Sequence, residues 1–588
     1  MREHHGNYHL GAGFTLAIIG CLLVVLMIAG VSGPSSSPGT AGAVLGATIQ
    51  INHSKKLRPI NIHGRKRVCS LPRKGSVACQ AEIALNSSGQ PLIASPASSG
   101  ALGPQQFHVG YQLPCTPGGA VESACPSPST YGPETIAIVD AGNFSSGVSG
   151  LESSLSGYDQ YYGLPACSTS NGCLSVVNQS GSASSLPADA GWSDEIALDV
   201  ETAHMVCQSC RVVLVEANDA YTSDLAAAEA TAASFNPDAI SNSWGDTTDD
   251  YSYDSNFEKP GIAIVASAGD SGSVGNGASW PADIPDVVGV AGTTLQLNTD
   301  NTWAGESLWS GSGGGCSTYY SAPSWQTGLT DWTNNGCGSY RSFADVSADA
   351  DPNTGAAVYL NGSWYEIGGT SLSAPLVASI YALDGGLPST AIGSSVPYAD
   401  ASTANFHDIS SGSDCVSGVT VHCTATNGFD TPTGLGSPNG TAGLAALPTP
   451  PDLSADIVNQ NEIMLKWTPS SSTSAISGYH VYRNGVLAAT VTTTSYDDTG
   501  LTPNTTYSYY VTGYDSSGAV SSQSSTVSAL SAYPADINAD GHINVLDLSL
   551  LASKYGQCSS TVGRADINGD GCVNLLDLSI LANKYGSE

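Results

Sequence analysis

The stretch Gly368-Gly369-Thr370-Ser371-Leu372-Ser373-Ala374-Pro375 decides how the centre of this 588-residue chain is interpreted. Two glycines and a threonine precede Ser371, and small apolar residues follow it, which is typical of a tight turn leading into a closely packed helix. A serine at such a turn is presented for attack, but its hydroxyl is a weak nucleophile that needs a neighbouring base. The chain must therefore supply that base from another segment.

The candidate base is a pair of carboxylates rather than a histidine. Glu195 and Asp199 are four residues apart on a segment predicted to be helical through Met205, so both side chains share one helix face. Two adjacent carboxylates cannot both ionise cheaply, so one pKa rises and the pair shares a proton. Such a pair can accept a proton from serine in mild acid and return it to a leaving amine. The alternative is a solvated acidic helix end.

A third carboxylate, Asp270, lies in Ala268-Gly269-Asp270-Ser271-Gly272, directly after a predicted buried strand. An ionised aspartate would repel an oxyanion, whereas a protonated one donates a hydrogen bond as an amide does. Asp270 and the carboxylate pair are thus both useful under one condition, low pH. The alternative for Asp270 is a turn-capping role.

Together these segments resemble the sedolisin (serine-carboxyl peptidase) family, whose motifs are Glu-x-x-x-Asp, Ser-Gly-Asp-Ser-Gly and Gly-Thr-Ser-x-Ser-x-Pro. The resemblance covers roughly residues 105–445 and includes Ser241 to Gly245 and Ala291 to Thr294. It implies a subtilisin-like α/β fold and an endopeptidase that cuts proteins at acidic pH. In this resemblance Ser371 is the nucleophile, Glu195 the general base, Asp199 its proton-sharing partner, and Asp270 an oxyanion donor together with the Ser371 amide.

The same resemblance implies one calcium ion near the C-terminal end of this domain. Its ligands would be the carboxylates of Asp408 and Asp430 and the carbonyls of Ile409, Thr426 and Gly428. Ligation by oxygen alone suits calcium.

Hydrophobic patterning independently favours an α/β domain. Residues 135–140, 211–216 and 262–267 are continuous apolar runs typical of buried strands, and the alanine-rich residues 224–235 are predicted to be a helix. This alternation predicts a parallel sheet with flanking helices, whose ligand sites gather at the carboxyl ends of the strands.

Residues 1–33 are interpreted as a secretory signal peptide, with a membrane anchor formed by the apolar residues 14–31 as the alternative. Residues 34–104 have little periodic pattern and are interpreted as a basic, low-complexity prosegment or linker. Eight basic side chains lie within residues 55–74, and we expect them to pair with the acidic body at neutral pH.

The acidic body argues against one class of partner. The net charge is −33, and residues 101–450 hold only three basic side chains, so nucleic-acid binding is excluded. Self-repulsion of this body fades as carboxylates protonate, which suits a protein that works in acid. The alternative is that the charge serves solubility alone.

Cysteine spacing indicates an oxidising, extracellular location. Fourteen cysteines fall in close neighbours, which favours local disulfides. The neighbours are 69/79, 115/125, 167/173, 207/210, 316/337, 415/423 and 558/572.

Two smaller modules follow a proline-rich linker at residues 446–451. Residues 452–532 resemble a fibronectin type III module, an immunoglobulin-like sandwich whose tyrosine corner would lie in Leu501 to Tyr507. Residues 534–588 contain two loops 30 residues apart that resemble those of a type I dockerin. Each loop spaces oxygen donors as an EF-hand does and continues into an apolar helix, so up to two calcium ions are expected. The candidate ligands are Asp536, Asn538, Asp540, His542, Asn544 and Asp547 in the first loop and Asp566, Asn568, Asp570, Cys572, Asn574 and Asp577 in the second.

The dockerin resemblance implies a cohesin-like or cell-surface partner for this tail. Residues 545–546 and 575–576 are Val-Leu and Leu-Leu, unlike the polar pairs common in cohesin-binding dockerins.

Two rival functions are weighed against the acid peptidase. A neutral subtilase needs a His-Gly-Thr segment, which is absent; Asp140 does end a predicted strand, but His204 lacks the following glycine. A non-catalytic adhesin or scaffold on a peptidase-like fold would not need the serine and the three carboxylates that this chain retains.

Overall fold

The computed structural model describes residues 64–70, 74–93, 96, 100–114, 131–248, 251–448, 451–459, 461–470, 472, 475–515, 520–521, 523–531 and 533–586. The predicted signal or anchor at residues 14–31 and the pair Cys115/Cys125 lie outside these residues. Among the residues described, no helix has the length and apolar character needed to cross a membrane.

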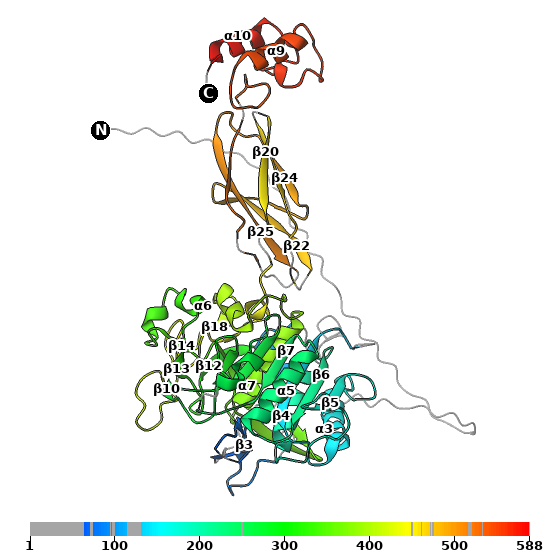
Figure 1. The fold of residues 1–588 in the computed structure, drawn as a ribbon, viewed down its shortest axis with the longest axis vertical. Coiled ribbons are helices and arrows are strands. Elements are labelled where there is room, and N and C mark those ends of the chain that lie inside the picture. Colours follow the sequence, from blue (N-terminus) through cyan, green and yellow to red (C-terminus); the bar gives the residue numbers. More distant parts are fainter. Residues whose placement is uncertain are drawn as a thin grey trace, which may run out of the picture. The chain divides into compact units, whose positions relative to one another are not determined.

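A large, mostly parallel sheet forms the centre of residues 64–448, as the sequence predicts (Figure 1). The strand order is β12-β11-β9-β7-β4-β6-β5, with β15 also paired to β11; only β12 runs antiparallel to its neighbour. The strands are β4 (Thr135–Ala141), β5 (Leu174–Asn178), β6 (Arg211–Ala217), β7 (Ala239–Asn242), β9 (Ala263–Ser267), β11 (Val288–Leu297), β12 (Trp303–Leu308) and β15 (Val346–Asp349).

Helices pack on this sheet because its central strands are apolar along their whole length. Every residue of β4 is buried, which is what a parallel strand covered on both faces requires. The helices in contact with the sheet include α4 (Ser193–Val206), α5 (Thr222–Ser234) and α7 (Thr370–Leu383). In α7, all residues from Thr370 to Ala382 are buried, and many are small, so α7 approaches both α4 and the strands closely.

A second, antiparallel sheet has the order β1-β3-β17-β16. It joins β1 (Gly64–Arg67) and β3 (Glu82–Leu85) to β17 (Ser363–Gly368) and β16 (Ala356–Leu360). Just before β3, the short strand β2 (Ala78–Cys79) pairs antiparallel with β8 (Trp244–Gly245). Residues 64–70 and 74–93, which lie within the stretch interpreted as a prosegment or linker, thus contain strands that its weak periodic pattern did not indicate. These strands are too short to show a period, and they form because edges of the larger domain offer free backbone groups.

The rest of this domain consists of short elements around the two sheets. They are α2 (Pro104–Gly110), α3 (Gly147–Tyr162), β10 (Gly275–Gly277), β13 (Gly315–Ser321), α6 (Ser324–Thr327), β14 (Tyr340–Ser342), α8 (Val396–Ala399), β18 (Phe406–His407) and β19 (Ser437–Pro438).

The next module is a sandwich of two antiparallel sheets, ordered β20-β21-β24 and β23-β22-β25-β26. The backbone N–H of Thr502 donates to the Tyr507 hydroxyl at 3.0 Å, so the predicted tyrosine corner is confirmed. The strands are β20 (Leu453–Asn459), β21 (Glu462–Trp467), β22 (Ile476–Arg483), β23 (Val486–Val491), β24 (Ser495–Thr499), β25 (Thr506–Asp515) and β26 (Val527–Leu530).

The last module contains two helices, α9 (Val545–Lys554) and α10 (Leu575–Lys584), each preceded by a predicted calcium loop. The side chain of Asn544 caps α9 by accepting from the Leu546 amide, and Asn574 caps α10 in the same way.

Six of the seven predicted disulfides fall on described residues and are formed. They are Cys69–Cys79, Cys167–Cys173, Cys207–Cys210, Cys316–Cys337, Cys415–Cys423 and Cys558–Cys572.

Candidate active site

Ser371 lies in the first turn of α7, directly after a turn that only glycine fits. Gly369 has φ of +103°, and a Cβ there would collide with the Gln80 carbonyl oxygen and with Asp270 Oδ2. The Ser371 side chain is fully buried, and its hydroxyl donates to the Ser243 carbonyl at 3.0 Å. The predicted nucleophile is thus held at a helix N-terminus, where the local dipole favours negative charge.

The predicted carboxylate pair lies beside this serine. Glu195 and Asp199 are on α4, which packs against α7, and both are fully buried. Ser243 links the two helices, since its hydroxyl donates to Asp199 Oδ1 at 2.9 Å while its carbonyl accepts from Ser371. Among the described residues, neither carboxylate oxygen of Glu195 accepts a hydrogen bond. The packing of α4 against α7 thus brings the predicted base and the predicted nucleophile into neighbouring positions.

Burial and mutual repulsion hold this cluster in protonated forms. Burial, then repulsion from Asp199 and Asp140, raises the pKa of Glu195 well above its usual value, and the Ser371 hydroxyl opposes that shift. Burial followed by repulsion from Asp140 likewise raises the pKa of Asp199, while its bond from Ser243 lowers it. At neutral pH, therefore, not every carboxyl group of the cluster is ionised.

The structure adds Asp140 to this cluster, a residue that the sequence argument considered only for a neutral subtilase. Asp140 lies at the carboxyl end of β4, fully buried, and burial raises its pKa to about 7. Glu216 pairs with it in register on β6, and burial, then repulsion from Asp140, raises the pKa of Glu216 to about 8. The sequence feature that could have identified Asp140 is its position at the carboxyl end of a parallel strand.

Asp270 approaches the serine from the other side. Its Oδ1 accepts from both the backbone N–H and the hydroxyl of Thr370, each at 2.8 Å. Its Oδ2 is buried and has no partner among the described residues. Burial, then repulsion from Glu82, raises the pKa of Asp270 to about 8, so below that pH a proton on Oδ2 is available for donation.

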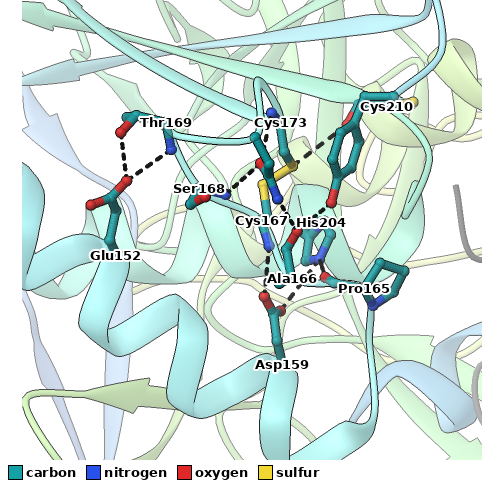
Figure 2. The surroundings of a disulfide bond; sticks show 12 residues. Glu152, Asp159, Pro165, Ala166, Cys167, Ser168, Thr169, Cys173, His204 and Cys210 are labelled. Atoms are coloured by element: carbon teal, nitrogen blue, oxygen red, sulfur yellow. Dashed lines mark hydrogen bonds and ion pairs between the residues drawn. A yellow bond between two sulfur atoms is a disulfide. The ribbon is translucent and has the colours of Figure 1, made fainter. Parts of the chain in front are cut away.

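His204 belongs to a different environment, shown in Figure 2. Its Nε2 contacts the Pro165 carbonyl at 2.8 Å and Asp159 Oδ1 at 3.3 Å, beside the Cys167–Cys173 disulfide. It lies nine residues beyond Glu195 on α4, about 13 Å along the helix axis. The ring therefore supports local packing and is not the partner of Ser371.

Four of the five predicted calcium ligands in this domain are linked through hydrogen bonds. The Gly428 N–H donates to Asp408 Oδ2 at 3.1 Å, and the Thr426 N–H donates to Asp430 Oδ2. A further carboxylate, Asp331, accepts from the Phe429 N–H at 2.9 Å. Asp331 is far from the other residues in the sequence, so no local motif links it to them. The oxygen-rich donor set fits a hard cation such as calcium.

The two loops of the last module share one hydrogen-bond pattern. Asp547 accepts from the backbone amides of Ile537, Asn538 and Asn544, and Asp577 accepts from the equivalent amides of its loop. In the first loop, ligand atoms of Asp536, Asp540 and Asp547 all lie within 4.8 Å of one another. Three carboxylates converging on one point fit a divalent cation.

Comparison with known proteins agrees with this modular order. The model of the subtilase family matches residues 190–385, that of the fibronectin type III domain residues 448–529, and that of the dockerin type I domain residues 534–584. The family matches thus cover part of the central domain and most of both predicted modules.

Individual relatives match parts of the chain. Sedolisin of Pseudomonas sp. (strain 101) is 35% identical over 173 residues, which are 27% of this chain and 28% of that protein. Kumamolisin of Bacillus sp. (strain MN-32) is 30% identical over 286 residues, 44% of this chain and 51% of that protein. The chain thus spans about a quarter to a half of the length of these relatives.

Among solved structures, Pseudomonas sedolisin (serine-carboxyl proteinase) complexed with two molecules of pseudo-iodotyrostatin matches with a TM-score of 0.47 and 25% identity, covering 58% of this chain and 95% of that one. On the family matches and these relatives, the chain carries a subtilase-family domain related to sedolisin and kumamolisin, followed by a fibronectin type III domain and a type I dockerin domain.

Proposed function

We propose that this chain is a secreted serine-type endopeptidase of the serine-carboxyl class, which hydrolyses peptide bonds of proteins at acidic pH. One observation carries the proposal: a buried serine at a helix N-terminus is surrounded by Glu195, Asp199 and Asp270, with no histidine among the described groups around it.

In the proposed mechanism, the Ser371 hydroxyl attacks the substrate carbonyl while Glu195 takes its proton. Asp199 shares that proton and is itself held by Ser243. The developing oxyanion accepts hydrogen bonds from the Ser371 amide and from protonated Asp270. Glu195 then returns the proton to the leaving amine, and water hydrolyses the acyl-enzyme by the same steps in reverse.

Acid dependence follows from the direction of the pKa shifts. Asp270, with a pKa of about 8, is neutral and a donor below that value; above it, the ionised carboxylate repels the oxyanion. We therefore expect activity to be present in acid and to be lost as the pH rises through this value.

The first prediction tests the proposal directly. Hydrolysis of a denatured protein is expected at pH 3–5, and Ser371→Ala is expected to lower kcat/KM by at least about 10⁴-fold, because no nucleophile remains. A pH–rate profile on both proteins measures this. Ser379→Ala is the matched control, since Ser379 is a buried serine of the same helix that bonds only the Pro375 carbonyl. Undiminished hydrolysis by Ser371→Ala would refute the assignment.

We further propose that calcium binds the loop containing Asp408, Ile409, Thr426, Gly428 and Asp430, and also both dockerin loops. The converging carboxylates around Asp536 support the tail sites. When bound, the ion would neutralise these carboxylates and stabilise the loops that hold them.

The second prediction concerns calcium removal. Chelation is expected to destabilise the dockerin domain by about 2.7 kcal/mol for each site, if free calcium was a hundredfold above Kd. Hydrogen exchange of the full chain with and without EDTA should show faster exchange in residues 536–547 and 566–577. Peptides from β22 and β25 serve as the internal control. Unchanged exchange in both loops would contradict calcium binding by the tail.

The disulfides and the exposed surface of the tail support a proposal for where the chain acts and what its tail binds. Six disulfides suit an oxidising, extracellular environment. In the first turns of α9 and α10, Val545, Leu546, Leu575 and Leu576 are each at least 56% exposed. We propose that these apolar pairs dock the enzyme to a cohesin-like or cell-surface partner.

A further inference from the structure

A disulfide joins the second dockerin loop to the end of the helix before it. Cys572 is the seventh residue of that loop, and it is bonded to Cys558, four residues beyond the end of α9. The residues beside the disulfide are paired through the backbone: Val573 accepts from the Gly556 N–H at 2.8 Å and donates to the Gln557 carbonyl at 2.9 Å. The middle of this loop is thus fixed to the end of α9 by covalent and hydrogen bonds together.

The first loop has a similar backbone contact without the covalent bond. Ile543, which is equivalent to Val573, accepts from the Gly586 N–H at 2.7 Å, so each loop pairs with the end of the other loop's helix. His542 stands where the second loop has Cys572, and its side chain is exposed. Residues 536–547 contain no cysteine, so the first loop is held against its neighbour by non-covalent contacts.

This difference matters because each loop gathers carboxylates. Ligand atoms of Asp536, Asp540 and Asp547 lie within 4.8 Å of one another, and ionised carboxylates at that separation repel unless a cation lies between them. Without a cation, the first loop can relieve this repulsion by opening. The second loop carries aspartates at the same three positions, but the bond to Cys558 restricts how far its centre can move.

We infer that the Cys558–Cys572 disulfide keeps the second loop close to its calcium-binding shape when calcium is absent, whereas the first loop opens. The inference rests on the proposed calcium binding by the tail. A loop that is already ordered loses less conformational entropy when it binds an ion. The second loop should therefore bind calcium at a free concentration at least about tenfold lower than the first loop requires.

The two apolar pairs proposed for docking then respond differently to calcium. Each pair lies in the first turn of the helix that its loop leads into, and the last residues of the loop cap that helix. Leu575 and Leu576 follow the disulfide-bonded loop, so they stay in place when calcium is low. Val545 and Leu546 follow the first loop, so they are held in place only when calcium is bound. Calcium thus controls half of the proposed docking surface.

The third prediction follows the two loops separately, by hydrogen exchange of the full chain at pH 7 over a series of buffered free calcium concentrations. A Ser371→Ala background keeps the chain intact. Removing calcium should lower the protection factors of both loops, and at least about tenfold further in residues 536–547 than in residues 566–577. Combining Cys558→Ser with Cys572→Ser should abolish this difference by lowering protection in residues 566–577, and saturating calcium should restore it there.

The outcomes separate this inference from calcium binding itself. Thr561→Ala is the matched control, since Thr561 is exposed on the same connecting segment, and it should behave as the parent. If removing calcium lowers the protection of both loops equally, or if the double serine variant keeps the difference, the inference is refuted and calcium binding stands. If neither loop responds to calcium, both proposals fail. The comparison of the two loops in the disulfide-bonded chain remains decisive even if the double variant does not fold.

Discussion

Replacing Glu195 with glutamine is expected to lower kcat/KM by about 10⁴-fold, at the upper end of the range for loss of a general base. Glutamine keeps the shape of the side chain but cannot take the proton from Ser371. The carboxylate has no hydrogen-bond partner among the described residues, so the substitution breaks no bond that holds the fold. The measurement is kcat/KM on a denatured protein at pH 4, with the fold checked by circular dichroism.

Two other variants separate this loss from a change of local charge. Asp194→Asn alters the neighbouring, half-exposed residue in the same helical turn and should retain activity. Asp270→Asn should also remain active and should work at higher pH, because an amide donates to an oxyanion without needing to be protonated. Equal activity in Glu195→Gln and the wild-type chain would contradict the carboxylate-base mechanism.

The catalytic domain is expected to lose stability as the pH rises from 4 to 8. Glu229 illustrates the cause: it is fully buried on α5, and burial raises its pKa to about 8. Below its ordinary pKa of 4.5 it is protonated in both states. As the pH rises, Glu229 ionises first in the unfolded chain. The free energy of unfolding therefore falls continuously between the unfolded pKa and the folded pKa. The loss for this residue is on the order of 4 kcal/mol.

Glu229→Gln should therefore flatten the pH profile of stability. The substitution removes the ionisation and keeps the volume, so the variant should exceed its parent in unfolding free energy by a few kcal/mol at pH 8 and match it near pH 4. Urea denaturation at both pH values, in a Ser371→Ala background to prevent self-digestion, measures this. Glu258→Gln, at an exposed position, is the control and should stay within about 0.5 kcal/mol of the parent. If the unfolding free energies of Glu229→Gln and its parent changed with pH in parallel, Glu229 would ionise as easily in the folded state as in the unfolded state.

Much of the site could be predicted because its components are short-range patterns. Glu195 and Asp199 share a helix face by covalent spacing alone, and the α4 helix has both on buried positions. The turn before Ser371 needs a positive φ at residue 369, and glycine is the residue that adopts this conformation without strain. The dockerin loops and the close cysteine pairs are likewise encoded within a few residues.

Other parts could not be predicted because they depend on contacts between distant segments. Asp140 joins the carboxylate cluster only because β4 ends beside α4, and Asp331 reaches the Asp408 region from a separate loop. Neither residue lies in a motif that spacing could reveal.

The sequence by itself determined the glycine turn before Ser371, the carboxylate pair, the alternating strands and helices, and the two EF-hand-like loops, since each depends on neighbours along the chain. Only the tertiary structure decided what lies against Ser371, namely the carbonyl of Gln80 from a segment that looked irregular. The physical reason is that backbone hydrogen bonds hold this segment to β8 and β17. Such bonds need no particular side chains, so the pairing leaves almost no trace in the order of residues.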